Sequence, residues 1–372
     1  MKPTIVVGGA LANKCGSGGE AWVRLSWIRG LQGLGFDVWF VEQIEEPTGE
    51  RVAYFDEVID EFGLVDRAAL LSNEGAVRGP ELATLLDVAA ESALINISGH
   101  VDHARLFERF RTRVYIDIDP GFTQSWHAAG LAGARLDGHD HYVTIAERIG
   151  ATDCPIPTCG LEWKTVRQPV VLGDWPVVAP VAPLRFTTVG SWRGPFGPVT
   201  IDDRTFGLKV HEFRSIITLP TLATHLFELA LDIHPGDDVD RQTLLANSWR
   251  LVDPRAAAHG PDQFRAYVQG SGAEFSVAQG VYVGTNSGWF SDRTVRYLAS
   301  GRPALVQDTG FSRTLPTGMG LIAFATLDEA VRGANDAMAR YDEHSLAARR
   351  LAEEHFAAER ILPRLCEQCG IS

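Results

Sequence analysis

The chain has 372 residues, of which 45% are hydrophobic and 22% are charged, and its formal net charge is −13. This length exceeds what a single hydrophobic core usually serves, so the composition predicts a globular protein of two domains. The negative charge argues against a nucleic acid or an anionic membrane as the main partner, because both would repel the chain at long range.

The sequence carries no sign of a targeting segment. Met1 leads directly into a strand-like stretch, without the long apolar run of a signal peptide, and no other stretch approaches a membrane span. The five cysteines are scattered, and Cys366 and Cys369 have the spacing of metal ligands but no second pair nearby. We therefore expect a cytoplasmic protein without an integral membrane segment, a disulfide framework or a metal site.

The first half of the chain alternates between strand-like and helical patterns. The expected strands are 4–7, 37–42, 93–98, 114–117 and 142–145. The expected helices are 21–34, 51–62, 81–91 and 103–109. This alternation is typical of a parallel sheet with helices on both faces, so it predicts a Rossmann-like domain over residues 1–160.

A proline-rich stretch separates this half from the next. It predicts a linker over 161–184, because the repeated prolines disfavour regular helix and central strand. The alternation then resumes, with expected strands at 185–189, 227–233, 249–252, 277–283 and 304–307. Helical patterns follow at 327–341 and 345–369. We infer a second doubly wound domain over 185–345 and a terminal helix over 346–372.

A glycine-rich loop follows the first expected strand and opens onto a helix. Glycines such as Gly16, Gly18 and Gly19 let the backbone approach a ligand closely, and a helix N-terminus supplies amide donors. The loop lacks the Gly-Lys-Ser/Thr ending of a P-loop, which argues against ATP hydrolysis. It is either a purely structural turn or a loop that lines a cleft.

Acid–base candidates stand after two expected strands of the first domain. His100 follows the strand 93–98, and Asp119 follows the strand 114–117. Residues past the carboxyl ends of parallel strands line the ligand crevice of an open sheet. Either side chain could therefore accept a proton from a hydroxyl, or could simply cap the next helix. His139, Asp140 and His141 do not predict a metal site, because adjacent residues of an extended segment point in different directions.

The second domain offers two cations for a phosphate group. The strand 185–189 leads into small residues, among them Ser191, and then into Arg193. Lys209 is the only lysine in this domain. Arginine can grip a diphosphate through two parallel hydrogen bonds and lysine as a compact charge, although each residue could equally be a solvated surface cation.

The region 284–310 carries the most specific pattern in the sequence. An apolar stretch expected to be a strand ends in Ser287-Gly288, a helix with Asp292 in its first turn follows, and Gly301 precedes Pro303 and another strand. Free backbone amides at the start of such a helix suit an anionic diphosphate.

This pattern resembles the donor half of GT-B glycosyltransferases. The resemblance rests on the helix, the small-Gly-Arg-Pro turn and the strand that ends in Asp308-Thr309-Gly310, and it is strongest over 185–330. The chain also looks like a group of bacterial glycosyltransferase-like proteins that carry Asp-Pro-Gly-Phe-Thr-Gln and Gly-Trp-Phe-Ser-Asp-Arg segments. The resemblance implies two Rossmann-like domains that face a cleft, with the C-terminal helix crossing back to the first domain.

The resemblance also assigns roles to individual residues. Ser287 and Gly288 would meet the diphosphate, and Asp292 or Arg293 would approach the ribose or a phosphate. The segment from Asp308 to Gly310 would face the sugar. Ser191, Arg193 and Lys209 remain candidates for the donor site.

Two features depart from the family pattern. Many retaining GT-B enzymes have two glutamates eight residues apart, where this chain has Gly288 and Arg296. Many inverting members have a catalytic histidine in the first glycine-rich loop, where this chain offers only Glu20. The general base therefore stays open among His100, Asp119 and Glu20.

The expected function is transfer of a hexose-like sugar from a nucleotide-diphosphate donor to a small-molecule acceptor such as a natural product. GT-B enzymes usually need no metal, and the sugar nucleotide would be a co-substrate rather than a cofactor. The alternatives are a nucleotide-sugar epimerase or hydrolase of the same fold, and a non-catalytic partner that binds a nucleotide sugar. The sequence does not indicate the nucleotide, the stereochemistry or the oligomeric state.

Overall fold

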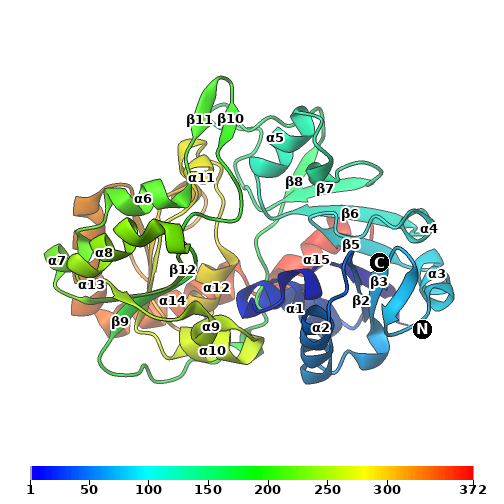
Figure 1. Cartoon of the computed structure of the whole chain (residues 1–372), viewed down its shortest axis with the longest axis horizontal. Helices are drawn as coiled ribbons and strands as arrows, with labels where there is room; N and C mark the ends of the chain where they lie inside the picture. Colours follow the sequence, from blue (N-terminus) through cyan, green and yellow to red (C-terminus); the bar gives the residue numbers. More distant parts are fainter. Residues whose placement is uncertain (1, 372) are drawn as a thin grey trace.

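The computed structural model describes residues 2–371. They form two α/β domains that face each other (Figure 1). The first sheet comprises β1 Thr4–Gly8, β2 Asp37–Gln43, β3 Ala68–Ser72, β4 Gly75–Arg78, β5 Ala93–Ile97, β6 Thr112–Asp117, β7 His141–Thr144 and β8 Trp163–Thr165. Its helices are α1 Gly18–Gly33, α2 Gly49–Glu61, α3 Leu82–Ala90, α4 Ala104–Phe107 and α5 Phe122–Ala128. The strand order is β4-β3-β2-β1-β5-β6-β7-β8, and all neighbours are parallel except β3 and β4.

The second domain repeats this design with a fully parallel sheet. Its strands are β9 Arg185–Ser191, β12 Leu226–Asp232, β13 Arg250–Leu251, β14 Ala273–Ser276, β15 Ala304–Gln307 and β16 Leu321–Phe324, and a separate hairpin joins β10 Val199–Ile201 to β11 Arg204–Phe206. Its helices are α6 Lys209–Ser215, α7 Leu219–Ala223, α8 Asp238–Ala246, α9 Pro254–Ala258, α10 Pro261–Gln269, α11 Gly280–Gly284, α12 Asp292–Ala299 and α13 Leu327–Ala339. The strand order is β13-β12-β9-β14-β15-β16. The predicted pair of doubly wound parallel-sheet domains is therefore confirmed.

Each sheet has one point at which the strand order reverses direction. In the first domain the reversal lies between β1 and β5, and in the second it lies between β9 and β14. The loops that leave the carboxyl ends of two such strands diverge and open a crevice, which is where ligands of open parallel sheets bind. The fold thus points to the loops after β1, β5, β9 and β14.

A continuous apolar core joins the domains. Trp22 of α1 lies with its ring centroid 5.0 Å from that of Trp175, and Trp175 lies 6.1 Å from Phe264 of α10. The indole nitrogen of Trp22 also donates to the carbonyl of Pro261 at 2.9 Å. Aromatic burial of this kind contributes much of the energy of an interface, so the two domains are packed as one body.

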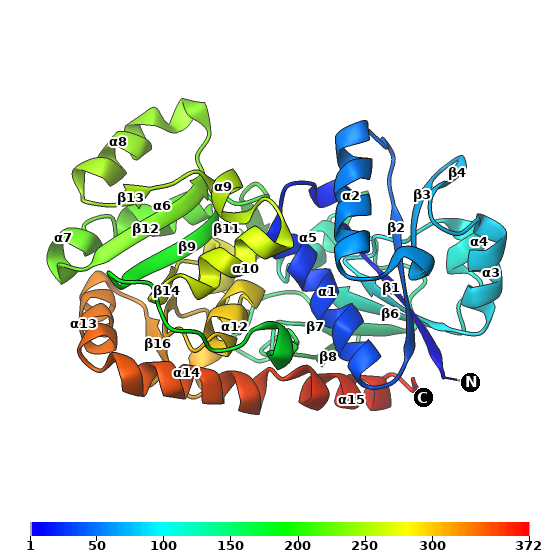
Figure 2. The ribbon, with the colours of Figure 1, turned by 90° about the horizontal axis from the view of Figure 1, so that it is seen from below.

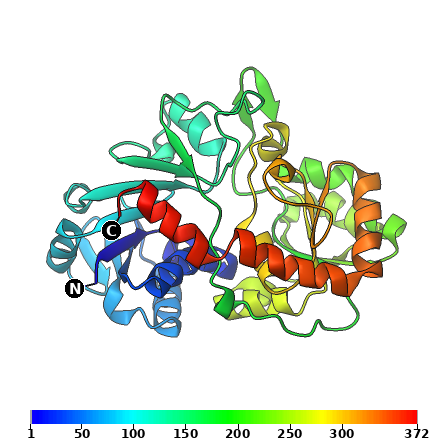
Figure 3. The same cartoon turned by 180° about the vertical axis from the view of Figure 1, so that it is seen from behind.

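The chain crosses between the domains twice, and the two crossings are hydrogen-bonded to each other. The amide of Val170 donates to Phe356 and the amide of Ala358 donates to Val170, both at 2.9 Å. Helix α14, Tyr341–His355, packs on α12, and α15, Ala358–Gln368, packs on α1 (Figures 2 and 3). The predicted return of the C-terminal helix to the first domain is confirmed. No helix among residues 2–371 is long and apolar enough to cross a membrane.

The predicted strand at 277–283 is wrong. Most of this apolar run forms α11, and the strand that occupies the sheet is β14, just before it. The sequence pattern did not predict β14, because this strand is short and contains the charged residue Glu274. In the structure Glu274 is fully buried and paired with Arg293. A tertiary ion pair therefore overrides the apparent polarity of this strand.

Other departures concern short or interrupted elements. The strands β3 and β4 were not predicted, and β8 lies within the stretch predicted as linker. As the last strand of its sheet, β8 pairs with β7 alone and needs no strong apolar pattern. The predicted terminal helix is two helices, because the chain extends at Ala357 to pair with Val170.

The closed packing of the domains can be tested at Gly18. A methyl group there would lie 2.0 Å from the carbonyl oxygen of Gly260 in the other domain. Although alanine favours a helix over glycine, we expect Gly18→Ala to lower the free energy of unfolding by about 1–3 kcal/mol, as overpacking does. Chemical denaturation measures this change.

Gly33→Ala is the matched control, because a methyl group at Gly33 of the same helix would meet nothing within 4 Å. We expect this variant to keep or raise the stability, by up to about 1 kcal/mol. Equal stability of the two variants would contradict the contact between Gly18 and Gly260.

Candidate active site between the two domains

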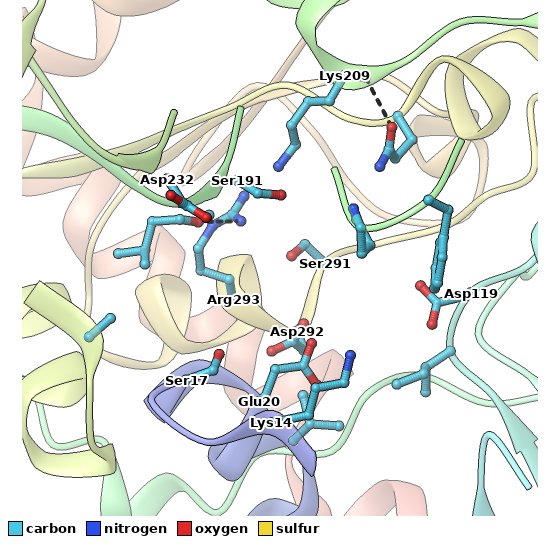
Figure 4. Close-up of a pocket in the computed structure, with 18 of the residues that line it drawn as sticks. Lys14, Ser17, Glu20, Asp119, Ser191, Lys209, Asp232, Ser291, Asp292 and Arg293 are labelled. Carbon is cyan, nitrogen blue, oxygen red and sulfur yellow. Dashed lines mark hydrogen bonds between the residues drawn. The ribbon is translucent and has the colours of Figure 1, made fainter. Parts of the chain in front are cut away.

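A cleft of about 1090 Å³ lies between the domains, at the carboxyl ends of both sheets. Its walls include residues from the loops at both reversal points, such as Lys14 and His100 from the first domain and Ser191 and Gln279 from the second. Figure 4 shows these two walls with their charged side chains directed toward a common space. Side chains of both domains can therefore reach one ligand, or two ligands in contact.

Arg293 is fixed at the second-domain wall by three hydrogen bonds. Its guanidinium donates to Glu274 at 2.7 Å, to the carbonyl of Val189 at 3.0 Å and to the hydroxyl of Ser276 at 2.5 Å. Because these partners hold the side chain rigidly, its charge is presented to the cleft without a further loss of side-chain entropy.

Lys209 lies next to Arg293 at the start of α6. Its Nζ would lie 3.3 Å from a Cβ atom on Gly190, so the missing side chain at Gly190 leaves room for the amine. Burial and then the charge of Arg293 lower the pKa of Lys209 to about 7. A bound anion would offset both effects, so this pair of cations is suited to a phosphate group.

The N-terminus of α12 opens into the same wall. Ser291, Asp292 and Arg293 line the cleft, and Ser291 is the N-cap residue of the helix. The carboxylate of Asp292 is bound to Arg296 one turn later. Figure 4 shows Ser291 and Asp292 on the same side of the cleft as Ser191, Lys209 and Arg293, so the positive end of the helix dipole lies near these side chains.

Several residues expected at the donor site lie outside the cleft. Ser287 is fully buried, its carbonyl accepts from the amide of Arg148 at 3.1 Å, and the amide of Gly288 donates to Thr309 at 2.8 Å. The carboxylate of Asp308 accepts from the amide of Gly310 at 2.8 Å. These segments pack the second domain against the loop around Arg148.

Arg193 also lies outside the residues that line the cleft. Its guanidinium forms two hydrogen bonds with Asp237, at 2.8 and 2.5 Å, and its side chain is 54% exposed. Of the predicted donor residues, the structure therefore brings together Ser191, Lys209, Asp292 and Arg293.

The three acid–base candidates of the first domain all line the cleft. Burial alone would raise the pKa of Glu20, but the charges of Arg24 and Lys14 outweigh burial and lower the pKa to about 2. Burial, and then the charges of Arg24, Arg135 and Lys14, lower the pKa of His100 to about 3. Neither group is a strong base near neutral pH.

Asp119 differs from the other two. Burial, the nearby Glu20 and the buried Asp117 raise its pKa to about 7. Its carboxylate accepts a hydrogen bond of 3.2 Å from the hydroxyl of Tyr282, which belongs to the opposite domain. The ring of Tyr282 in turn stacks on Trp289 at 4.3 Å. Asp119 is thus a titratable group near neutral pH, held at the point where the two domains meet.

The glycine-rich loop serves two purposes. Gly16 lines the cleft, whereas Gly18 packs on Gly260 and Gly19 on Phe264, both in the second domain. The buried carboxylate of Glu42 accepts from the amides of Leu11, Ala12 and Asn13, at 2.7 to 2.8 Å. Because Glu42 already occupies these amides, this part of the loop is a fixed turn and not a phosphate cradle.

The sequence analysis missed other residues that line the cleft. They lie in the carboxyl-terminal halves of strands or in the loops and helices that follow: Lys14, Tyr115, Trp126, Arg135, Phe196, Asp232, Arg241, Asp253, Arg255, Tyr282 and Trp289. Asp232 ends β12 and Asp253 lies two residues after β13, so their positions at the carboxyl ends of expected strands could have indicated them, but no pattern in the sequence marks the others.

The cysteine and histidine groups form no metal site in the part of the chain that the structure describes. Cys366 and Cys369 are free and buried. His139 contacts Asn96 and the carbonyl of Leu136, both at 3.0 Å. Asp140 binds Arg113 instead, and His141 faces Lys164.

Comparisons with known proteins agree on the architecture. No family model matches the sequence, and the search of curated proteins gave no match. Sucrose-phosphate synthase from Thermosynechococcus elongatus aligns with a TM-score of 0.58 and 10% identity, over 99% of this chain and 98% of the other. Anabaena HepE in complex with UDP and glucose aligns with a TM-score of 0.60 and 12% identity, over 98% of both chains. AviGT4, a glycosyltransferase involved in avilamycin A biosynthesis, aligns with a TM-score of 0.58 and 14% identity, over 98% of this chain and 96% of the other.

The chain has the GT-B fold. The likeness covers both domains and their arrangement, because nearly the full length of each chain is aligned. In the GT-B arrangement the cleft lies between the two sheets, where this structure places Lys209, Arg293 and Asp119.

The raised pKa of Asp119 makes a prediction about the stability of this GT-B protein. In the unfolded chain the carboxyl titrates near 3.8, and in the folded chain near 7, so the folded state binds the proton more tightly. The contribution of Asp119 to stability is therefore present at low pH and is lost as the pH rises from about 4 to about 7. Asparagine at this position keeps an acceptor for Tyr282 and carries no charge.

We expect Asp119→Asn to raise Tm at pH 8 by about 2–4 °C, and to bring no gain near pH 4. Thermal unfolding of both proteins across this range measures the difference. Asp60→Asn, at an exposed position of α2, is the control and should show no pH-dependent gain. A gain that stays constant with pH would contradict the raised pKa of Asp119.

Proposed function

We propose that this protein transfers a sugar from a nucleotide-diphosphate sugar, bound by the second domain, to an acceptor bound by the first. One observation carries the proposal. A single cleft holds two adjacent cations, Lys209 and Arg293, on one wall and a carboxyl group that titrates near neutral pH, Asp119, on the other. Glycosyl transfer needs both, because negative charge develops on the leaving diphosphate while the acceptor loses a proton.

The donor site is assigned to the end of β9, the start of α6 and the start of α12. Lys209 and Arg293 would contact the diphosphate, and the amides at the start of α12 would add hydrogen bonds. Ser191 lies between these groups in Figure 4. The positive charge comes from side chains and backbone, so we propose that transfer requires no metal.

UDP is the first nucleotide to test. Anabaena HepE is described in complexes with UDP, with UDP and glucose, and with UDP-glucose, and an α-glucosyltransferase of the same fold is described with UDP. The fold neighbour AviGT4 acts in the biosynthesis of a natural product, which supports a small-molecule acceptor of that kind.

Asp119 is the general base in this proposal. As the acceptor oxygen attacks the sugar carbon, the bond from that carbon to the diphosphate breaks, and the carboxylate of Asp119 takes the proton of the acceptor hydroxyl. A base with a pKa near the working pH combines sufficient ionisation with sufficient basicity. Glu20 and His100, with pKa values of about 2 and 3, hold a proton too weakly for this step.

A thermal-shift series with UDP, GDP, ADP and dTDP tests the donor site. We expect UDP to raise Tm, since a ligand at a hundredfold excess over its dissociation constant adds about 2.7 kcal/mol to the stability. Lys209→Met should weaken UDP binding about tenfold or more in isothermal titration calorimetry, because a charge-assisted contact to phosphate is lost.

Arg193→Met is the matched control for Lys209→Met. Arg193 is a cation of the same domain, but its side chain binds Asp237 outside the cleft. We expect this variant to bind UDP as the unmodified protein does. No shift with any nucleotide would refute the proposal, and equal loss in both variants would refute the assignment of the diphosphate site to Lys209.

The role of Asp119 is tested by turnover. We expect Asp119→Asn to lower kcat by about 10²–10⁴-fold, because it removes the base, and to leave UDP affinity unchanged. His100→Gln should have a much smaller effect. The assay measures UDP released from UDP-glucose in the presence of a panel of small hydroxylated acceptors.

The same assay separates the alternatives. UDP released at full rate without any acceptor would favour a hydrolase or an epimerase that releases its nucleotide. UDP-glucose binding without turnover for any acceptor would favour a non-catalytic sugar-nucleotide-binding protein. Full activity of Asp119→Asn would remove Asp119 from the mechanism.

A further inference from the structure

Four side chains that line the cleft have no role in the proposed reaction. Lys14, Arg135 and Trp126 belong to the first domain, and Phe196 belongs to the second. Neither cation takes part in donor binding or proton transfer as argued above. These four side chains therefore bear on what the acceptor is.

Arg135 is held over the cleft by a turn that is anchored on both sides. The carbonyl of Ala134 accepts from the hydroxyl of Tyr115 at 2.9 Å, and the carbonyl of Leu136 lies 3.0 Å from Nδ1 of His139. Arg135 itself has a left-handed backbone with φ of 50°, which a residue with a side chain rarely adopts. The anchors fix this conformation and with it the direction of the side chain.

A glycine makes room for this arginine. A Cβ atom on Gly99, in the turn after β5, would lie 2.7 Å from Cβ of Arg135, so only glycine at this position allows the close approach. The nearest carboxylate to Arg135 is that of Asp102, at 4.0 Å, and it is 55% exposed. Such a contact is weak in water, which leaves the guanidinium free to bind a ligand.

Lys14 directly follows a second turn that is fixed by hydrogen bonds. The amides of the three preceding residues are bound by the buried carboxylate of Glu42. Figure 4 shows the side chain of Lys14 directed into the cleft beside Glu20. Glu20 forms its ion pair with Arg24, and no ion pair to Lys14 occurs among residues 2–371.

The two cations act on the same space. The pKa of His100 is lowered first by burial and then by Arg24, Arg135 and Lys14, so their fields overlap at that residue. Arg24 is already paired with Glu20, whereas Arg135 has only the weak contact with Asp102 and Lys14 has no ion pair among residues 2–371. The positive charge that remains calls for an anion from the ligand.

The same cleft contains an aromatic surface. The ring of Trp126 on α5 and the ring of Phe196 in the loop after β9 lie 4.8 Å apart, nearly perpendicular at 86°. Both rings are only half-buried, and a Cβ atom on Gly133 would be in ordinary van der Waals contact with the ring of Trp126, at 3.7 Å. Each domain supplies one ring, so a flat apolar group that packs against the faces left exposed would contact both domains.

We propose that the acceptor is a hydroxylated aromatic anion, whose carboxylate or phosphate group binds Lys14 and Arg135 and whose ring packs on Trp126 and Phe196. This inference rests on the proposed function, because it places the hydroxyl of the acceptor at Asp119. It adds a chemical class of acceptor, which neither the fold nor the neighbours define.

Binding of matched probes tests the inference. Hydroxynaphthoate, hydroxynaphthyl phosphate and the neutral hydroxynaphthamide share the ring and the hydroxyl and differ in charge. Isothermal titration calorimetry on the full chain, with and without saturating UDP, should show at least one of the anions bound about tenfold or more tightly than the amide. The anion that binds more tightly shows whether the site prefers a carboxylate or a phosphate group.

Variants separate charge from packing. Lys14→Met and Arg135→Met should each reduce the preference for the anion and leave the affinity for the amide unchanged. Phe196→Ala should lower the affinity for the anion and the affinity for the amide by the same factor. Arg111→Met, which removes an exposed cation of the same domain that is paired with Glu91, is the control and should change neither.

Equal binding of anion and amide by the unmodified protein would overturn the inference, and so would a preference that survives in both cation variants. UDP binding is measured on the same samples. If the protein binds UDP but shows no preference among the probes, the inference about the acceptor is refuted and the proposed sugar-nucleotide site still stands. If the protein prefers the anion but binds no nucleotide, the proposed transfer is refuted and the anion site still stands.

Discussion

The ion pair between Glu274 and Arg293 holds together the parts of the second domain that form the cleft. Glu274 lies in the middle of β14, with none of its side chain exposed, and Arg293 lies in the first turn of α12. The same guanidinium binds the carbonyl of Val189 at the end of β9. A buried carboxylate without its partner is strongly destabilising, so the pair fixes α12 relative to both strands of the reversal point. The position of Lys209 against Gly190 depends on this framework.

The domains are held closed by contacts that lie on either side of the cleft. On one side α1 packs on α10 through Trp22 and Gly18, and on the other Tyr282 donates to Asp119. Closure has a chemical consequence. It excludes water from Asp119, which raises the pKa of the carboxyl, and it places Lys209 and Asp119 in one cavity. The packing that joins the domains is therefore also the main cause of the raised pKa of Asp119.

Sequence patterns predicted the fold well where many residues repeat one signal. The alternation of strands and helices predicted both sheets, because buried parallel strands are continuous apolar runs. The patterns failed at β14, where a buried charge resembles a surface residue until its partner is known. They also could not show that Ser287 is buried at the domain interface, since its partner Arg148 is distant in sequence. Asp119 was found because its position after a strand is a local fact, and Lys209 because it is the only lysine of its domain, whereas Lys14 and Arg135 depend on turns whose anchors are distant in sequence.

The two positions at which many retaining GT-B enzymes have glutamates show how this chain differs. Gly288 has φ of 73°, and a Cβ atom there would lie 3.1 Å from the amide nitrogen of Arg148 in the first domain. A glutamate is therefore excluded by backbone conformation and by the closed packing, and not merely absent. Arg296, at the second position, is buried with Asp292 and Ser26 of α1, and so it also serves the contact between domains. Both positions are used for packing in this protein. Neither position therefore offers a carboxylate to the cleft, whereas Asp292, Arg293 and Lys209 on the same wall do line it.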